Sequence, residues 1–115
     1  MAARPAVREL APALVEEIKL ALEDLGETDL LGNLDSLEAW GRCSCGDEFC
    51  SSFYTGPRPN GAWSNEGDHR NVALPVSRGM VILDIVSGEI RYVEVLDRPD
   101  IEALIRDLPP LPRTD

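Results

Sequence analysis

The chain has 115 residues, 43% of them hydrophobic and 28% charged, which fits one folded domain with a core of its own. The net charge of −10, from 21 acidic and 11 basic side chains, repels a phosphate backbone and argues against DNA or RNA as a partner. No stretch approaches the ~18 apolar residues of a membrane span, and no apolar leader precedes a cleavage site, so we expect a cytoplasmic protein without membrane contact.

The first predicted element is an amphipathic helix from about Ala11 to Leu25. Pro12 fits its first turn, where a missing N–H costs little, and Gly26 ends it. The leucine-rich segment 30–37 that follows fits either a short helix or an irregular connection. The apolar pattern at steps of three and four begins before this helix and predicts one buried face: Val7, Leu10, Leu14, Ile18, Ala21 and Leu25.

Residues 37–55 predict a β-hairpin, with strands 37–45 and 50–55 around a turn at 46–49. Side chains alternate between the two faces of a strand, so one face is expected to carry Leu37 and Ala39. The same alternation places Trp40 and Phe53 on the opposite face.

All three cysteines of the chain belong to this hairpin, in the sequence Cys-Ser-Cys-Gly-Asp-Glu-Phe-Cys. Cys43 and Cys45 should point to one side of the first strand, and Cys50 should lie opposite Cys45 on the same side. The sequence therefore predicts three converging thiols, on the face assigned to Leu37 and Ala39.

The segment 55–69 is rich in Gly, Pro and Asn and is predicted to be a long loop. A strand is expected over 71–76, and Pro75 limits it to an edge of the sheet or a bulge.

Strands 80–86 and 89–96 form a second predicted hairpin around Ser87-Gly88. Uninterrupted pairing with this two-residue turn would place Asp84 opposite Arg91; a bulge at Gly88 would remove that pairing. The expected core face is Val81, Leu83, Ile85, Ile90, Tyr92 and Leu96.

A last helix is expected after Asp97, which would cap it, with Pro99 in its first turn. Its apolar stripe is Ile101, Leu104, Ile105 and Leu108.

The predicted fold is a single α+β domain over residues 1–115, with frayed ends at 1–4 and 110–115. It combines an N-terminal and a C-terminal helix with an antiparallel sheet of about five strands, built from two hairpins and an edge strand.

Three clustered thiols indicate a zinc site, because structural zinc takes four ligands that are mostly thiolates and imidazoles. His69, the only histidine, would complete a Cys3His set if the long loop folds back over Cys43, Cys45 and Cys50. Asp47, Glu48, Asp68 or a water molecule are alternative fourth ligands. The spacing Cys-x-Cys-x4-Cys differs from the paired Cys-x2-Cys of common zinc modules.

Two other interpretations remain open for the cysteines. Free cysteines are often buried as small hydrophobic residues, so the three thiols fit a purely structural role beneath the sheet. Thiol redox chemistry needs a stabilised thiolate, and the neighbouring acids Asp47 and Glu48 would instead raise the thiol pKa values.

Five of the six aromatic residues lie between positions 40 and 63, close to the cysteines in sequence, and interfaces are enriched in such residues. We expect a binding protein that uses an aromatic and acidic surface toward a protein partner, with zinc as the cofactor that fixes the hairpin. The alternative is a zinc- or thiol-dependent enzyme with its site at the cysteines and His69. The expected partner-binding residues are Trp40, Phe49, Tyr54 and Trp63.

Residues 83–96, Leu-Asp-Ile-Val-Ser-Gly-Glu-Ile-Arg-Tyr-Val-Glu-Val-Leu, resemble the closing hairpin of various small bacterial domains. The resemblance covers about an eighth of the chain and implies no activity, ligand or partner.

Overall fold

A computed structural model describes residues 4–45, 49–57 and 68–110 of the chain. In these ranges the chain forms four α-helices, one 3-10 turn and five strands. The helices are α1 (Val7–Leu10), α2 (Pro12–Leu25), α3 (Leu31–Asp35) and α4 (Pro99–Ile105), and the 3-10 turn η1 is Thr28–Leu30. The strands are β1 (Gly41–Arg42), β2 (Phe53–Tyr54), β3 (His69–Ala73), β4 (Met80–Val86) and β5 (Glu89–Leu96).

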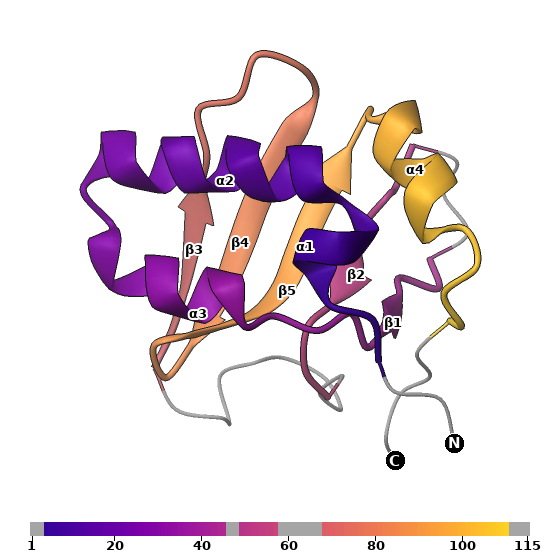
Figure 1. Cartoon of the computed structure of the whole chain (residues 1–115), viewed down its shortest axis with the longest axis horizontal. Helices are drawn as coiled ribbons and strands as arrows, with labels where there is room; N and C mark the ends of the chain where they lie inside the picture. Colours follow the sequence, from indigo (N-terminus) through magenta and orange to yellow (C-terminus); the bar gives the residue numbers. More distant parts are fainter. Residues whose placement is uncertain (1–3, 46–48, 58–67, 111–115) are drawn as a thin grey trace.

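The five strands form one antiparallel sheet in the order β1-β2-β5-β4-β3. Helices α1, α2 and α3 lie in front of the sheet in Figure 1, with α4 beside them toward the β1 and β2 edge. The predicted α+β class, with helices near both ends of the chain and a sheet of five strands, is confirmed.

Helix α2 begins at Pro12 and ends at Leu25, as the sequence predicts, because the next residue, Gly26, adopts the left-handed conformation (φ 76°) that stops a helix. Its buried face includes Val15 and Leu22, whereas Leu25 is 46% exposed at the helix end. The predicted apolar face was therefore wrong at its C-terminal end. The ambiguous segment that follows is helical, as η1 and α3.

The β4–β5 hairpin contains a bulge that the sequence analysis missed. Its turn has two residues, as predicted, and both have positive φ (Ser87 51°, Gly88 80°), as a type I′ turn requires. Ile85 pairs with Ile90, but Asp84 pairs with Tyr92, so Arg91 is an extra residue in β5. Of the pairings that the sequence left open, the one between Asp84 and Arg91 therefore does not form.

The backbone around the bulge is held by side chains from other segments. The Thr55 hydroxyl donates to the Ile90 carbonyl at 2.7 Å, and the Thr55 N–H donates to the Arg91 carbonyl at 3.0 Å. The Asn33 side-chain carbonyl accepts from the Ile90 N–H at 2.6 Å. The bulge turns Tyr92 and Leu96 away from the core and brings Val93 and Val95 into it, which corrects the predicted core face.

Strand β3 lies at an edge of the sheet and pairs only with β4 among the described strands, as Pro75 led us to expect. The strand begins at His69, two residues earlier than predicted, and ends at Ala73. Pro75 therefore lies beyond the strand and removes no hydrogen bond from the sheet.

Helix α4 starts at Pro99, but Asp97 does not cap it. The N-cap position is Arg98, no side chain caps the helix, and Asp97 has a left-handed backbone (φ 57°). In the predicted stripe, Ile101, Ile105 and Leu108 are buried and Leu104 is 44% exposed.

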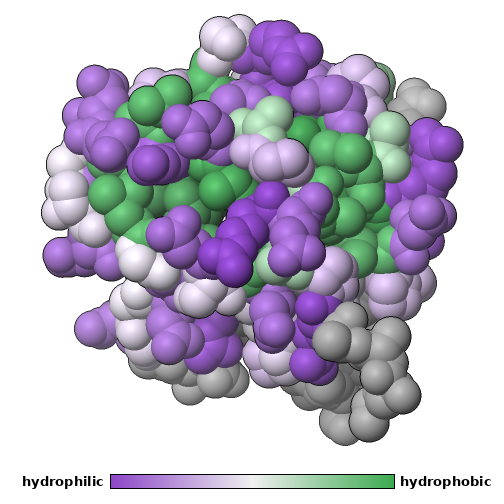
Figure 2. Space-filling view, in the orientation of Figure 1, coloured by the Kyte–Doolittle hydropathy of each residue, from purple (hydrophilic) through white to green (hydrophobic). Residues whose placement is uncertain are grey.

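The core lies between the sheet and the helices. It contains residues of α1, α2, α3 and α4 together with Val81, Leu83 and Val93 of the central strands. On the helical face, Figure 2 shows two hydrophobic areas that reach the surface on either side of a hydrophilic band. The predicted frayed ends overlap residues 1–3 and 111–115, which lie outside the described ranges.

Candidate metal centre

The β1–β2 hairpin forms with the predicted register, although its strands are only two residues long. The pairing continues past the end of β1, where the Cys43 N–H donates to the Ser52 carbonyl at 2.9 Å. Extended beyond β1, this register would bring Cys45 opposite Cys50, as the sequence predicts. The turn residues 46–48 lie outside the described part of the chain.

The sulfur atoms of the three cysteines come together. The Sγ atoms of Cys43, Cys45 and Cys50 all lie within 4.8 Å of one another. In a tetrahedral zinc site with Zn–S bonds of about 2.3 Å, the sulfur atoms are about 3.8 Å apart, so small side-chain movements would suffice to bind an ion. The three cysteines therefore lie close enough to bind a metal.

The cluster lies at the surface and outside the hydrophobic core. Cys45 is exposed, Cys43 and Cys50 are half-buried, and all three are free thiols. None of the three belongs to the core cluster, in contrast to Leu37 and Ala39. The prediction that Leu37 and Ala39 share the face of the cysteines is therefore wrong, because regular alternation begins only at Gly41.

The cysteines share the sheet face that points away from the helices. Cys50 forms an isolated bridge with Leu96, whereas Phe53 projects into the core with Val93, its partner on β5. On the cysteine face, Tyr54 pairs with Tyr92, and their rings are 4.5 Å apart between centroids. Two tyrosines thus lie beside the thiol cluster.

The Tyr92 hydroxyl interacts with both Cys43 and Ser52. Burial raises the pKa of Tyr92, and the interaction with Cys43 raises it further, so the phenol stays protonated and available as a donor. Burial tends to raise the pKa of Cys43, but hydrogen bonds from Tyr92 and from Cys45 outweigh burial and leave it below its ordinary value. Burial raises the pKa of Cys50 to about 11, against the hydrogen bonds from Ser52 that lower it.

His69 does not join the cysteines. It lies on β3, at the opposite edge of the sheet from β1, four strand spacings or about 19 Å away. There its Nε2 approaches the Asp84 carboxylate at 3.4 Å, and Asn71 donates to the same oxygen at 2.7 Å. The predicted Cys3His set is not assembled, because pairing with β4 holds His69 in the sheet.

Of the other predicted protein ligands for the fourth position, one lies far from the thiols and two lie outside the described residues. Asp68 precedes β3, and its carbonyl accepts from the Ser87 N–H at 2.8 Å, which ties it to the far edge of the sheet. Asp47 and Glu48, which lie between Cys45 and Cys50 in sequence, are outside the described residues.

The four aromatic residues expected to bind a partner have different environments. Phe49 is 58% exposed, whereas Tyr54 is buried against Tyr92. Trp40 is half-buried, with the Arg4 guanidinium 3.6 Å from its ring centroid. Trp63 lies outside the described residues. Tyr92 was missed as a neighbour of the thiols, because only the bulge in β5 reveals which face it occupies. Ser52 was also missed, although the predicted hairpin register already places it opposite Cys43.

No protein-family model, curated protein or solved structure matches this chain. Within the described residues, no helix is both long enough and apolar enough to span a membrane.

Proposed function

We propose that this protein is a small interaction domain whose β1–β2 hairpin is fixed by a zinc ion bound to Cys43, Cys45 and Cys50. The observation that supports this most is the approach of the three Sγ atoms to within 4.8 Å. Thiolates are soft ligands that favour zinc, whereas magnesium and calcium prefer oxygen.

The burial of the cysteines supports metal binding over a packing role. Cysteines that act as small hydrophobic residues are buried in the core, whereas Cys45 is exposed and the other two are half-buried. Asp47, Glu48 or a water molecule would supply the fourth ligand in this proposal.

The proposed interaction role rests on Phe49. Its ring is 58% exposed and it directly precedes Cys50, so an ion held by Cys50 would also fix the position of the ring. Aromatic residues contribute much of the binding energy of protein interfaces. The charge of −10 favours a partner with a basic surface.

A zinc- or thiol-dependent enzyme at the same cysteines is the second candidate, favoured by the exposure of Cys45 to solvent. It lacks a general base at the site among the described residues, since His69 lies at the other edge of the sheet. A reactive thiol would be modified by iodoacetamide at the same rate with or without added zinc, whereas zinc bound by all three thiols would protect them.

The metal content of purified protein tests the zinc proposal. We expect one zinc ion per chain in the wild type and in His69→Ala, because His69 lies far from the thiols. Cys50→Ser should lose the ion, since it removes one of three thiolates. Elemental analysis gives the stoichiometry, and the absorption spectrum of the cobalt-substituted protein reports thiolate ligation. Zinc lost from His69→Ala, or a wild type that binds none, would contradict the proposal.

A further inference from the structure

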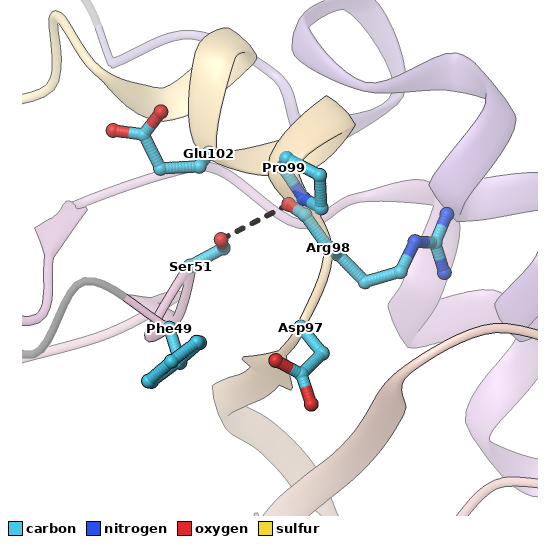
Figure 3. Close-up of a pocket in the computed structure, with 6 residues that line it drawn as sticks. All are labelled: Phe49, Ser51, Asp97, Arg98, Pro99 and Glu102. Carbon is cyan, nitrogen blue, oxygen red and sulfur yellow. Dashed lines mark hydrogen bonds between the residues drawn. The ribbon is translucent and has the colours of Figure 1, made fainter.

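A cavity of about 550 Å³ lies next to the cysteine hairpin, between the segment around Phe49 and the start of α4 (Figure 3). Its volume falls in the range of sites that bind small molecules or a few residues of a peptide. The residues that line it are Phe49, Ser51, Asp97, Arg98, Pro99 and Glu102.

Backbone hydrogen bonds hold the two walls of the cavity together. The Asp97 N–H donates to the Phe49 carbonyl at 3.0 Å, and the Ser51 N–H donates to the Val95 carbonyl at 2.8 Å. The Ser51 hydroxyl donates to the Arg98 carbonyl at 3.1 Å, as the dashed line in Figure 3 shows. The cavity is therefore largely formed before a ligand arrives, which lowers the entropy cost of binding.

The charge of the cavity is negative although an arginine lines it. The Arg98 guanidinium points away from the cavity in Figure 3, and its side chain is only 1% exposed. It forms ion pairs with Glu17 at 2.7 Å and with Asp100 at 3.0 Å. Asp97 and Glu102 supply the charge that remains in the cavity lining.

The two carboxylates are available to a ligand. No described residue forms a hydrogen bond or ion pair with the Asp97 carboxylate, whereas Glu102 pairs with Arg106 at 3.1 Å. That pair is solvent-exposed on both sides, at 42% and 67%, and exposed pairs of this spacing contribute little to stability. A ligand cation can replace Arg106 at little cost.

The apolar part of the lining determines which cation fits. The exposed Phe49 ring and the Pro99 ring offer surfaces for a hydrocarbon stem and for a flat cation. A guanidinium is flat, so it stacks on aromatic rings and also pairs with a carboxylate through two parallel hydrogen bonds. An ammonium cannot form this paired geometry. A divalent metal ion would need more oxygen ligands than two carboxylates supply.

We propose that this cavity binds an arginine side chain of a partner protein, with the guanidinium over the Phe49 ring and paired with the Asp97 carboxylate. The inference rests on the proposed interaction role and names the chemistry of the partner. Glu102 adds a second negative charge that attracts a basic segment around the bound arginine.

A peptide with and without the guanidinium charge tests the proposal. The first probe is a fluorescein-labelled peptide that contains two arginines with glycine and alanine between them. The second probe is the same peptide with each arginine replaced by citrulline, which has a similar shape but no charge. Fluorescence anisotropy gives the affinity, and amide chemical shifts locate the site. We expect binding of the arginine peptide to be about tenfold tighter, with shifts at Phe49–Ser51 and Asp97–Glu102.

Two variants probe the cavity itself. Asp97→Asn removes the charge and keeps a residue that tolerates φ 57°, so the fold should persist while binding weakens about tenfold. Phe49→Leu removes the ring at an exposed position and should weaken binding several-fold. Glu16→Gln, which removes the same charge from an exposed site on α2, is the matched control and should leave the affinity unchanged.

Equal affinity for the arginine and citrulline peptides would overturn the proposal, as would equal weakening by Asp97→Asn and Glu16→Gln, which would indicate attraction to net charge alone. If the protein self-associates and Asp97→Asn abolishes that self-association, the cavity binds a second copy of the chain and the proposal is overturned. Metal content measured on the same samples separates the two proposals. Arginine-dependent binding in protein that takes up no zinc would overturn only the zinc site.

Discussion

Tyr92 lies beside the thiols because of a single extra residue in β5. With uninterrupted pairing it would face the core next to Leu83, but Arg91 is unpaired and shifts every later side chain to the other face. The phenol then interacts with Cys43 and Ser52. Groups that donate hydrogen bonds to metal ligands tune the affinity of a site, so Tyr92 would act as a positioning residue if the three cysteines bind zinc as proposed.

Replacing Tyr92 with phenylalanine should weaken zinc binding about tenfold, because the thiolate of Cys43 loses a hydrogen bond donor. Competition with a chromophoric chelator measures the affinity. Tyr54→Phe is the matched control, since the Tyr54 ring packs against Tyr92 at a tilt but Tyr54 is not among the groups that lower the pKa of Cys43. Equal affinities in the two variants would show that the Tyr92 hydroxyl has no such role.

At the scale of elements, ion pairs and a hydrogen bond of Arg98 connect the start of helix α4 to α2 and to the β3–β4 connection. This buried arginine joins Glu17 on α2 to Asp100 at the start of α4, and it also donates to the Arg78 carbonyl at 3.5 Å. Gly79 allows the close approach of the β3–β4 connection, because a Cβ there would lie 2.4 Å from the Leu96 carbonyl oxygen. Three segments far apart in sequence therefore meet at one guanidinium.

Replacing Arg98 with methionine should lower the free energy of unfolding by about 2–4 kcal/mol, because Glu17 and Asp100 lose their cation in a partly buried site. Urea unfolding followed by circular dichroism measures the loss. Arg106→Met breaks an exposed pair with Glu102 and should change stability by less than about 0.5 kcal/mol. A loss no larger in Arg98→Met than in Arg106→Met would contradict this role.

The same contacts predict a dependence on acid pH. Hydrogen bonding to Arg98 lowers the pKa of Asp100 from its ordinary 3.8 to about 2. Because the folded pKa is the lower one, ionised Asp100 stabilises the fold above about pH 4, and that contribution is lost as the pH falls toward 2. In Asp100→Asn this part of the acid-induced drop in melting temperature should be absent. The difference between the two melting curves isolates Asp100 from the other carboxylates, and identical pH profiles would contradict the assignment.

The element scale also shows where local sequence rules were sufficient. Pro12 and Gly26 correctly predicted the bounds of α2, and Ser87-Gly88 correctly predicted a two-residue turn, because both depend on backbone conformations that only neighbouring residues determine. The core face of β5 was wrong beyond Ile90, because the bulge is held by Thr55 and Asn33, which are remote in sequence.

Considered as a whole, the molecule has its core on one side of the sheet and its thiols on the other. The core cluster joins the helices to the central strands, whereas the cysteines lie at the β1 edge. Zinc in the proposed site would therefore stabilise one hairpin and would not be needed for the main core to form. This differs from small zinc fingers, which have too little core to fold without metal.

Removal of metal by a chelator should therefore leave the protein folded, with a lower melting temperature. Amide hydrogen exchange should become faster in residues 41–54 and remain slow in β4, because β4 is paired on both sides, with β5 and β3, and most of its residues are buried. The chelator-treated Cys50→Ser variant is the control and should show no further change. Complete unfolding on chelation would mean that the core depends on the ion.

The sequence by itself determined the α+β class, the long helix, the Ser87-Gly88 turn and the register of the β1–β2 hairpin, since each follows from periodicity or from turn residues within a few positions. Only the tertiary structure decided that His69 lies at the far sheet edge, that Tyr92 faces the thiols and that Phe49 borders a negatively charged cavity. These features depend on strand order and on a bulge, which long-range hydrogen bonds and core packing select among alternatives that the local sequence permits equally.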